Sequence, residues 1–143
     1  MIDTHTSPYA ALVLRVALGT LALAHGLLKV LVFTPAGTVG FFESLGLPGA
    51  LAYATIAVEL VGGAALIAGV YTRLVSIAMI PILIGSIVFA HWDAGWLFSS
   101  QGGGWEFPAF WAVALVVQAL LGNGAYALQP GVARHRAAAL TSS

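Results

Sequence analysis

Residues 49–69 read GALAYATIAVELVGGAALIAG, and this stretch decides the fold class. It carries a single ionisable side chain, Glu59, and a helix needs roughly 20 mostly apolar residues to cross a bilayer. Similar stretches predict three further helical spans, at about residues 9–33, 73–90 and 107–128. The runs are too long for barrel strands and lack their alternation. We therefore predict an all-α fold, an integral membrane four-helix bundle that forms one domain over residues 1–143.

The composition points to lipid as the main solvent of the protein surface. The chain is 60% hydrophobic and 7% charged, with a mean hydropathy of +0.99, whereas soluble domains carry about 25% charged residues. The net charge is zero and there is no long basic run, so nucleic acid is not an expected partner. The absence of cysteine excludes disulfides and thiolate chemistry.

Two outer loops, 34–48 and 91–106, are expected between the spans, and four spans place both termini on one side. The charges on the two sides differ. Arginines mark the terminal side, at Arg15, Arg73, Arg134 and Arg136; the loop side has Lys29 with Glu43, Asp93 and Glu106. By the positive-inside rule, we predict a multi-pass protein of the inner (cytoplasmic) membrane with cytoplasmic N and C termini.

The ionisable residues of the first span share one stripe. With Arg15 at 0° and about 100° per residue, His25 lies near 280° and Lys29 near 320°. From the outer end, a rise of about 1.5 Å per residue places His25 roughly 12 Å deep, Lys29 roughly 6 Å and Glu59 roughly 15 Å. A His25–Glu59 hydrogen bond is therefore expected between adjacent antiparallel helices.

These side chains predict a polar pocket, because ionisable groups inside a bilayer are costly and usually have a partner or a task. Glu59, His25 and His91 are the candidates for proton exchange with a ligand, and Lys29 is a candidate for binding it. Two structural alternatives stay open. Glu59 and a cation could simply neutralise each other, and Lys29 could extend towards lipid head groups.

Further candidates lie outside this group. Arg15 could bind lipid head groups or cap neighbouring carbonyls, and Trp105 and Glu106 are ligand-binding candidates on the second loop. The four tryptophans, Trp92, Trp96, Trp105 and Trp111, equally suit an interfacial aromatic belt. His25, His91 and Glu59 could form a two-histidine, one-carboxylate set, but nothing in their spacing requires a metal, and none is predicted.

Several motifs in order resemble the DoxX family of small bacterial and archaeal membrane proteins. After Arg15 they are AHGLLK at 24–29, FFESLGLP at 41–48, ELVGG at 59–63, GVYTR at 69–73, His91, GGWEFP at 103–108 and LGNGAYAL at 121–128. The family commonly continues with Ser-Leu-Asp after the last tyrosine, where this chain has Ala127-Leu128-Gln129. The resemblance implies a four-helix membrane bundle. It also implies a place in respiratory, sulfur-oxidising or oxidative-stress redox assemblies.

The expected function is that of a quinone- or quinol-binding component of such an assembly, with quinone as cofactor and a redox protein as partner. Whether the chain is itself an enzyme or an oxidoreductase subunit stays open. One alternative is a scaffold or accessory subunit without chemistry of its own, which docks a partner through loop 91–106. Another is a small transporter, and a homo-oligomer is compatible with either.

Overall fold

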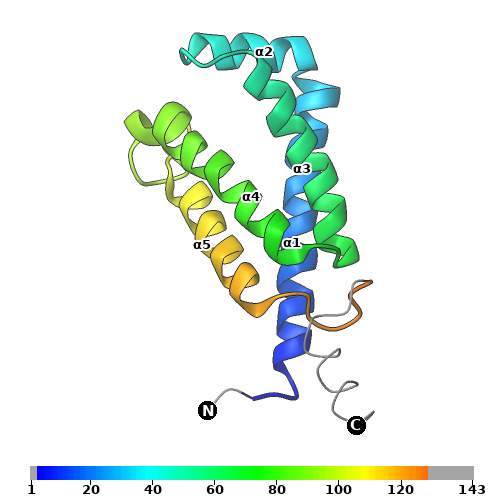
Figure 1. The fold of residues 1–143 in the computed structure, drawn as a ribbon. Coiled ribbons are helices and arrows are strands. Elements are labelled where there is room, and N and C mark those ends of the chain that lie inside the picture. The colour runs from blue at the N-terminus through cyan, green and yellow to red at the C-terminus, as the bar shows by residue number, and fades with distance from the viewer. Residues whose placement is uncertain (1–2, 129–143) are drawn as a thin grey trace.

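The structure of the chain, a computed structural model, describes residues 3–128, and every regular element within that range is helical. In chain order the elements are α1 (Ser7–Leu27), the π-helix η1 (Leu28–Val32), α2 (Pro35–Ser44), α3 (Ala50–Ala68), α4 (Thr72–Gly85), the π-helix η2 (Ser86–His91), the 3₁₀-helix η3 (Trp92–Ala94) and α5 (Glu106–Leu121). The helices α1, α3, α4 and α5 run along the length of the molecule, and α2 lies across one end (Figure 1).

Three helical segments are long and apolar enough to cross a membrane: Ser7–Val32, Ala50–Ala68 and Thr72–Ala94, with 26, 19 and 23 residues. At about 1.5 Å per residue they reach roughly 39, 28 and 34 Å, against a hydrocarbon core of about 30 Å. The shorter apolar helix α5 is the fourth member. The predicted fold class, an all-α membrane bundle, is therefore confirmed.

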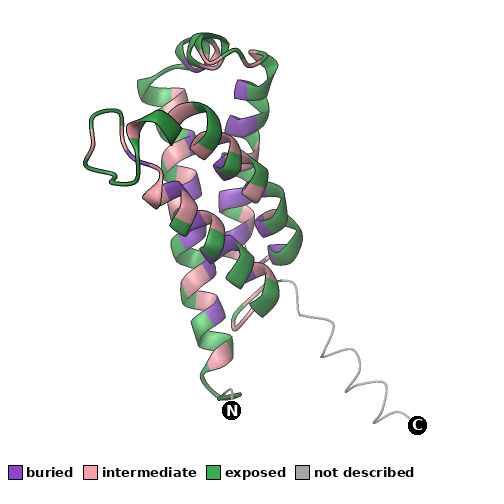
Figure 2. Cartoon of the chain, turned by 90° about the vertical axis from the view of Figure 1, so that its left-hand side faces the viewer, coloured by how far each residue is buried: buried purple, intermediate pink, exposed green. Residues whose placement is uncertain are grey.

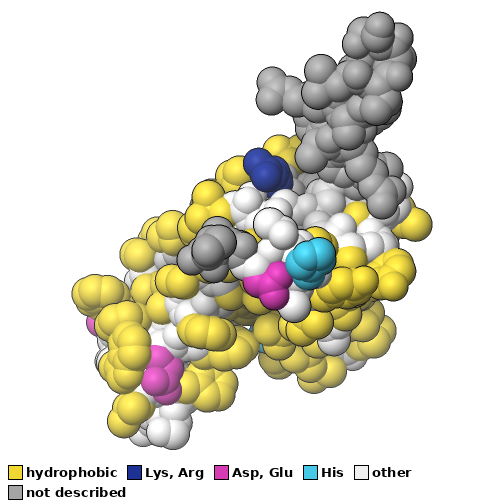
Figure 3. Space-filling model, turned by 90° about the horizontal axis from the view of Figure 1, so that it is seen from below, with side chains coloured by type: hydrophobic (Ala, Val, Ile, Leu, Met, Phe, Trp, Pro, Cys, Tyr) yellow, Lys and Arg dark blue, Asp and Glu magenta, His cyan; other side chains and the backbone are white. Residues whose placement is uncertain are grey.

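The surface supports the same conclusion. Buried residues lie on the inward faces of the helices, and exposed residues cover the outward faces (Figure 2). Many exposed side chains are large and hydrophobic, and hydrophobic side chains dominate the end view of the molecule (Figure 3). Such a surface is compatible with lipid, which removes the need to hide apolar groups from water.

The helices pack as two pairs, α1 along α3 and α4 along α5, and α2 lies across one end against α3 (Figure 1). We call the end at α2 the α2 end, and the opposite end the terminal end. The buried core between the pairs is formed by Leu18, Ala22, Leu66, Met79, Leu83, Trp111, Ala114 and Leu115. At the terminal end the backbone N–H of Ala125 donates to the carbonyl of Pro8 at 2.8 Å, which brings both ends of the described chain together.

Glycines allow α1 and α3 to approach closely. A Cβ added at Gly63 would lie 2.8 Å from the carbonyl oxygen of Gly19 and 2.9 Å from the backbone nitrogen of Leu23. A Cβ at Gly26 would meet the side chain of Leu60 at 2.8 Å. Small residues at helix contacts give membrane helices the van der Waals contact that holds them together.

Segment 34–48, expected to be a loop, instead contains α2. The hydroxyl of Thr34 accepts from the backbone N–H of Gly37 at 3.2 Å and caps the helix, and Pro35 follows at the first helical position, where proline is favoured. Gly46, with φ of 77°, lies just beyond the helix end. These local signals are sufficient to start and end a short helix.

The last helix is shorter than the expected span 107–128. It ends at Leu121 because Gly122 adopts a φ of 82°, which lies outside helical backbone. The chain then turns back, and the N–H of Leu128 donates to the carbonyl of Ala68. Arg134 and Arg136 lie outside the described residues, so the orientation of the termini stays a prediction.

The first testable prediction concerns the α1–α3 contact. Gly63→Ala should lower the free energy of unfolding by about 1–3 kcal/mol, because the added methyl group meets the backbone of α1. Gly85→Ala is the matched control, since a Cβ at that helical position has nothing within 4 Å. Unfolding in mixed detergent micelles, followed by circular dichroism, measures both. Equal stability of the two variants would contradict the close contact.

Candidate functional site

An ion pair joins the first and third helices near the α2 end. The ammonium nitrogen Nζ of Lys29 donates to both carboxylate oxygens of Glu59, each at 2.8 Å. The Glu59 side chain is 5% exposed and that of Lys29 is 19% exposed. Because an unpaired charge in an apolar interior is costly, each residue requires the other.

Lys29 therefore takes the place that the sequence analysis expected for His25. The ring nitrogen Nδ1 of His25 lies 2.9 Å from the carbonyl oxygen of Leu21, one turn earlier in α1. A carbonyl can only accept, so Nδ1 carries the proton, and in the neutral ring Nε2 is left as an acceptor. The ring itself lies against Trp111 and Phe107, with centroids at 4.9 and 6.1 Å.

His91 has a similar arrangement at the end of η2. Its Nδ1 lies 2.7 Å from the carbonyl oxygen of Gly103 and 3.3 Å from that of Gly102. The same reasoning leaves Nε2 of the neutral ring as an acceptor. Through these contacts His91 holds the glycine-rich loop between η3 and α5 against the end of η2.

These four residues line one cavity of about 910 Å³, which we call the inner cavity. Its walls come from all five α-helical regions, with α2 contributing Phe41 and Phe42. Both π-helices border it, η1 through Lys29 and η2 through His91. Short π-helical turns are frequent at functional sites, and here they place the ends of two long helices around a common space.

The sequence analysis did not single out the three hydroxyl-bearing residues on the wall of this cavity, Thr38, Thr55 and Ser86. The hydroxyl of Thr38 donates to the carbonyl of Lys29 at 3.2 Å and to that of Thr34 at 2.9 Å, which ties α2 to η1. A threonine carries no distinctive sequence signal, and only the fold places it there.

The remaining candidates lie elsewhere. Arg15 is 1% exposed and does not line the inner cavity. Its guanidinium donates to the carbonyls of Leu66 and Ile67 at 3.1 and 2.6 Å, and to that of Ala125 at 2.9 Å. Of the two roles expected for Arg15, the structure shows the capping of carbonyls. The positive charge at the C-terminal end of α3 also complements the helix dipole.

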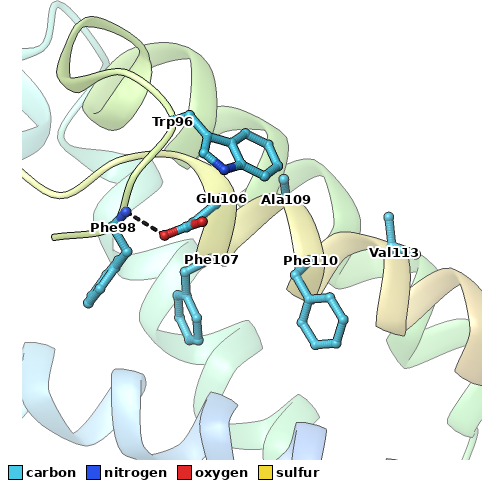
Figure 4. A pocket seen from close by; sticks show the side chains of 7 residues that line it. All are labelled: Trp96, Phe98, Glu106, Phe107, Ala109, Phe110 and Val113. Atoms are coloured by element: carbon cyan, nitrogen blue, oxygen red, sulfur yellow. Dashed lines mark hydrogen bonds between the residues drawn. The ribbon is translucent and has the colours of Figure 1, made fainter. Parts of the chain in front are cut away.

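Trp105 and Glu106 face outward from the inner cavity. The Trp105 ring contacts those of Trp92 and Trp96, at 5.9 and 4.5 Å between centroids. The carboxylate of Glu106 accepts from the backbone N–H of Phe98 at 2.7 Å and borders a second hollow of about 580 Å³ on the outside of α5 (Figure 4). We call this second hollow the outer groove.

No group of three histidine, aspartate or glutamate side chains within residues 3–128 is placed to hold a metal ion. His25, His91 and Glu59 thus line one cavity without forming a ligand set. The arrangement is suited to hydrogen bonding and proton exchange with a bound molecule, since it combines a cation, a carboxylate and two imidazole acceptors.

Comparisons with known proteins agree with this architecture. Residues 10–92 match the DoxX family model. Over 121 residues the chain is 36% identical to the "Putative oxidoreductase CatD" of Bacillus subtilis (strain 168), and the match covers 85% of each chain. No solved structure matches.

The second prediction tests the buried arginine. Arg15→Leu should lower the free energy of unfolding by about 2–4 kcal/mol, because three carbonyls lose a charged donor. Arg15→Lys should recover only part of the loss, since an ammonium lacks the planar fork of a guanidinium. Arg73→Leu is the control, because Arg73 is exposed and makes one 3.5 Å bond to Leu120. Equal losses in the two leucine variants would contradict this role.

The third prediction separates pairing from charge burial. Lys29→Met and Glu59→Gln should each cost about 3–5 kcal/mol of stability, because each leaves one buried charge without its partner. The double variant should cost much less than the sum of the single losses. Denaturation of all four proteins in the same micelles measures the coupling. Additive losses would mean that the pair does not interact.

Proposed function

The chain belongs to the DoxX family, and on that premise we propose that it binds a quinone or quinol head group in the inner cavity. In this role it is the membrane component of a redox assembly. The observation that supports the proposal is one cavity of about 910 Å³ that holds the Lys29–Glu59 pair and both histidines. Ligand pockets of about 300–1,000 Å³ with apolar walls and a few polar groups are typical of small-molecule sites.

The lining of the inner cavity supports the binding of a flat ring with oxygen atoms at its edge. Apolar and aromatic side chains make up most of its lining, among them Phe42, Leu83 and Trp111. The polar groups are confined to a few places, so a ring can contact apolar walls while its oxygens reach hydrogen-bonding partners. The indole N–H of Trp111 is also buried without a partner among the described residues, and such groups are normally satisfied by a ligand or water.

Lys29, Glu59 and the histidines have complementary tasks under this proposal. Lys29 has three N–H donors and uses two on Glu59, so the third can bind a carbonyl oxygen. Nε2 of His25 or His91 can accept from a hydroxyl group. Lys29 offsets the charge of Glu59 while its carboxyl group is ionised, and Glu59 can exchange a proton with a ligand bound beside the pair.

The electrons must come from elsewhere. Conversion between quinone and quinol takes two electrons with two protons, and this chain has no cysteine to exchange electrons through a thiol. Its residues supply binding and proton transfer, and a partner redox protein supplies the electrons. The name of the Bacillus relative, "Putative oxidoreductase CatD", supports such a setting. We further propose that the α2 end faces away from the cytoplasm, as the distribution of arginines indicates.

One observation favours the scaffold alternative. Trp92 and Trp96 are 61% and 54% exposed, and they pack on Trp105 in segment 91–106. Exposed aromatic clusters also occur at protein interfaces. This surface is compatible with docking of a partner whether or not the inner cavity binds a ligand, so ligand binding is the property that distinguishes the two functions.

The fourth prediction is saturable binding of ubiquinone and menaquinone analogues by the purified protein in lipid nanodiscs. Glu59→Gln and His25→Ala should each weaken binding about tenfold or more. Glu59→Gln removes the charged carboxylate that pairs with Lys29 and can exchange a proton, and His25→Ala removes an imidazole from the cavity wall. His5→Ala is the control, since His5 is exposed at the terminal end. The Lys29→Met/Glu59→Gln double variant removes both charges of the pair, so its binding shows whether an uncharged cavity still takes up the ligand.

Normal binding by both Glu59→Gln and His25→Ala would disprove the assignment of the site. Absence of binding by the folded wild type would disprove the quinone function altogether. In that case, capture of partners with and without the segment 91–106 becomes the test of the scaffold function.

A further inference from the structure

The inner cavity and the outer groove share two residues, Phe98 and Phe107. Their rings lie 5.5 Å apart between centroids and tilt by 54°. In Figure 4 both rings point the same way from neighbouring segments, with Phe110 and Val113 following along α5. The aromatic pair therefore lies where the space inside the bundle meets the space on its outer face.

The outer groove has the character of a path for hydrocarbon. It is lined by Trp96, Phe98, Glu106, Phe107, Ala109, Phe110 and Val113. Its one charged group, the Glu106 carboxylate, is already engaged with the backbone N–H of Phe98. Phe110 and Val113 are 73% and 61% exposed on an apolar helix, so this end of the groove opens towards the surroundings of the bundle.

One side of the inner cavity carries the charged groups, and the side next to the outer groove is aromatic. The ion pair comes from η1 and α3, whereas the aromatic pair comes from the last loop and α5. His25 lies between these sides, with its ring 6.1 Å from that of Phe107. A molecule with its polar end at Lys29 thus has an apolar route past Phe107, away from the charges.

We propose that the ligand of the inner cavity carries a long apolar tail, which leaves past the contacting rings of Phe98 and Phe107 and lies in the outer groove along α5. This inference rests on the proposed function and adds the path of the tail. From Phe107 to Val113 the helix rises about 9 Å, so the tail crosses the side of the bundle before it enters lipid. Phe98, Phe107, Phe110 and Val113 are then the residues beside which the tail of the ligand has room.

The groove need not attract the tail to be required for the binding of a tailed ligand. Lipid hydrocarbon is as apolar as the groove, so moving the tail between them gains little free energy. The contribution of the groove is space, because a head group can reach the polar wall only if its tail has a way out. Blocking the groove should therefore affect tailed ligands and leave tail-free ligands unaffected.

The test compares two probes on the full-length protein in phosphatidylcholine nanodiscs. One is a dimethoxy-methyl benzoquinone without a tail, and the other has the same ring with a decyl tail. Val113→Trp places a large ring in the outer groove. Val116→Trp is the matched control, because Val116 is 44% exposed on the same helix but lines neither cavity.

Val113→Trp should weaken binding of the decyl probe about tenfold or more and change that of the tail-free probe by less than about twofold. Val116→Trp should change neither. Equal effects of Val113→Trp on both probes, or none on the decyl probe, would overturn the tail path while leaving the quinone site standing. Failure of both probes to bind the wild type would overturn the proposed function itself.

A second measurement locates the tail directly. A diazirine at the end of the decyl tail should, on illumination, label peptides of α5 around Phe110 and Val113 in the wild type. An excess of tail-free quinone should suppress this label by competing for the inner cavity. Competable labelling of α2 instead would show that the tail leaves by the other side, and it would overturn this path.

Discussion

The close approach of α1 and α3 is the contact on which the other features of the structure depend. Gly19 and Gly63 let the two backbones meet, and this fixes what lies at either end of the pair. Towards the terminal end, Arg15 reaches the last carbonyls of α3. Towards the α2 end, Lys29 reaches Glu59. A larger separation would leave two cations and one carboxylate without partners in an apolar interior, where each is costly.

The charges of Arg15 and Lys29 are compensated in different ways. The partners of Arg15 are backbone carbonyls, whereas the partner of Lys29 is an ionisable side chain. Arg15 is 1% exposed and donates to three backbone carbonyls, so its hydrogen bonds serve the fold. Lys29 is paired with a side chain that can itself gain or lose a proton, and it keeps partial exposure to the inner cavity. The charge of the Lys29–Glu59 pair can therefore respond to a ligand, whereas that of Arg15 is committed to the helix end.

Much of this arrangement could be predicted from sequence, because the bilayer restricts the alternatives. Span lengths predicted the helical bundle, and the similar depths of His25 and Glu59, with Lys29 on the same stripe as His25, predicted one pocket for the three residues. Depth could not decide that His25 would donate to Leu21 in its own helix, since the partner depends on where the ring turns. Helix α2 and the early end of α5 depend on short backbone signals at Thr34 and Gly122, which hydropathy does not report.

The polar and the aromatic residues of the inner cavity are distributed differently along the sequence. All of its charged and hydroxyl-bearing residues, from His25 to His91, fall within residues 10–92, the part that matches the family model. Its aromatic residues come from both parts of the chain: Phe33, Phe41, Phe42 and Phe89 fall within residues 10–92, and Phe98, Phe107 and Trp111, which lie on the side of the outer groove, come after them. The polar wall mainly sets which chemical groups can be bound, because it offers most of the donors and acceptors, and the indole N–H of Trp111 adds one donor on the opposite side. The aromatic wall sets which shapes can enter and leave, because it borders the groove that leads to lipid. Under the proposed function, a change in one wall can thus alter which ligand tail is accommodated without altering proton exchange at the other wall, and the reverse holds equally.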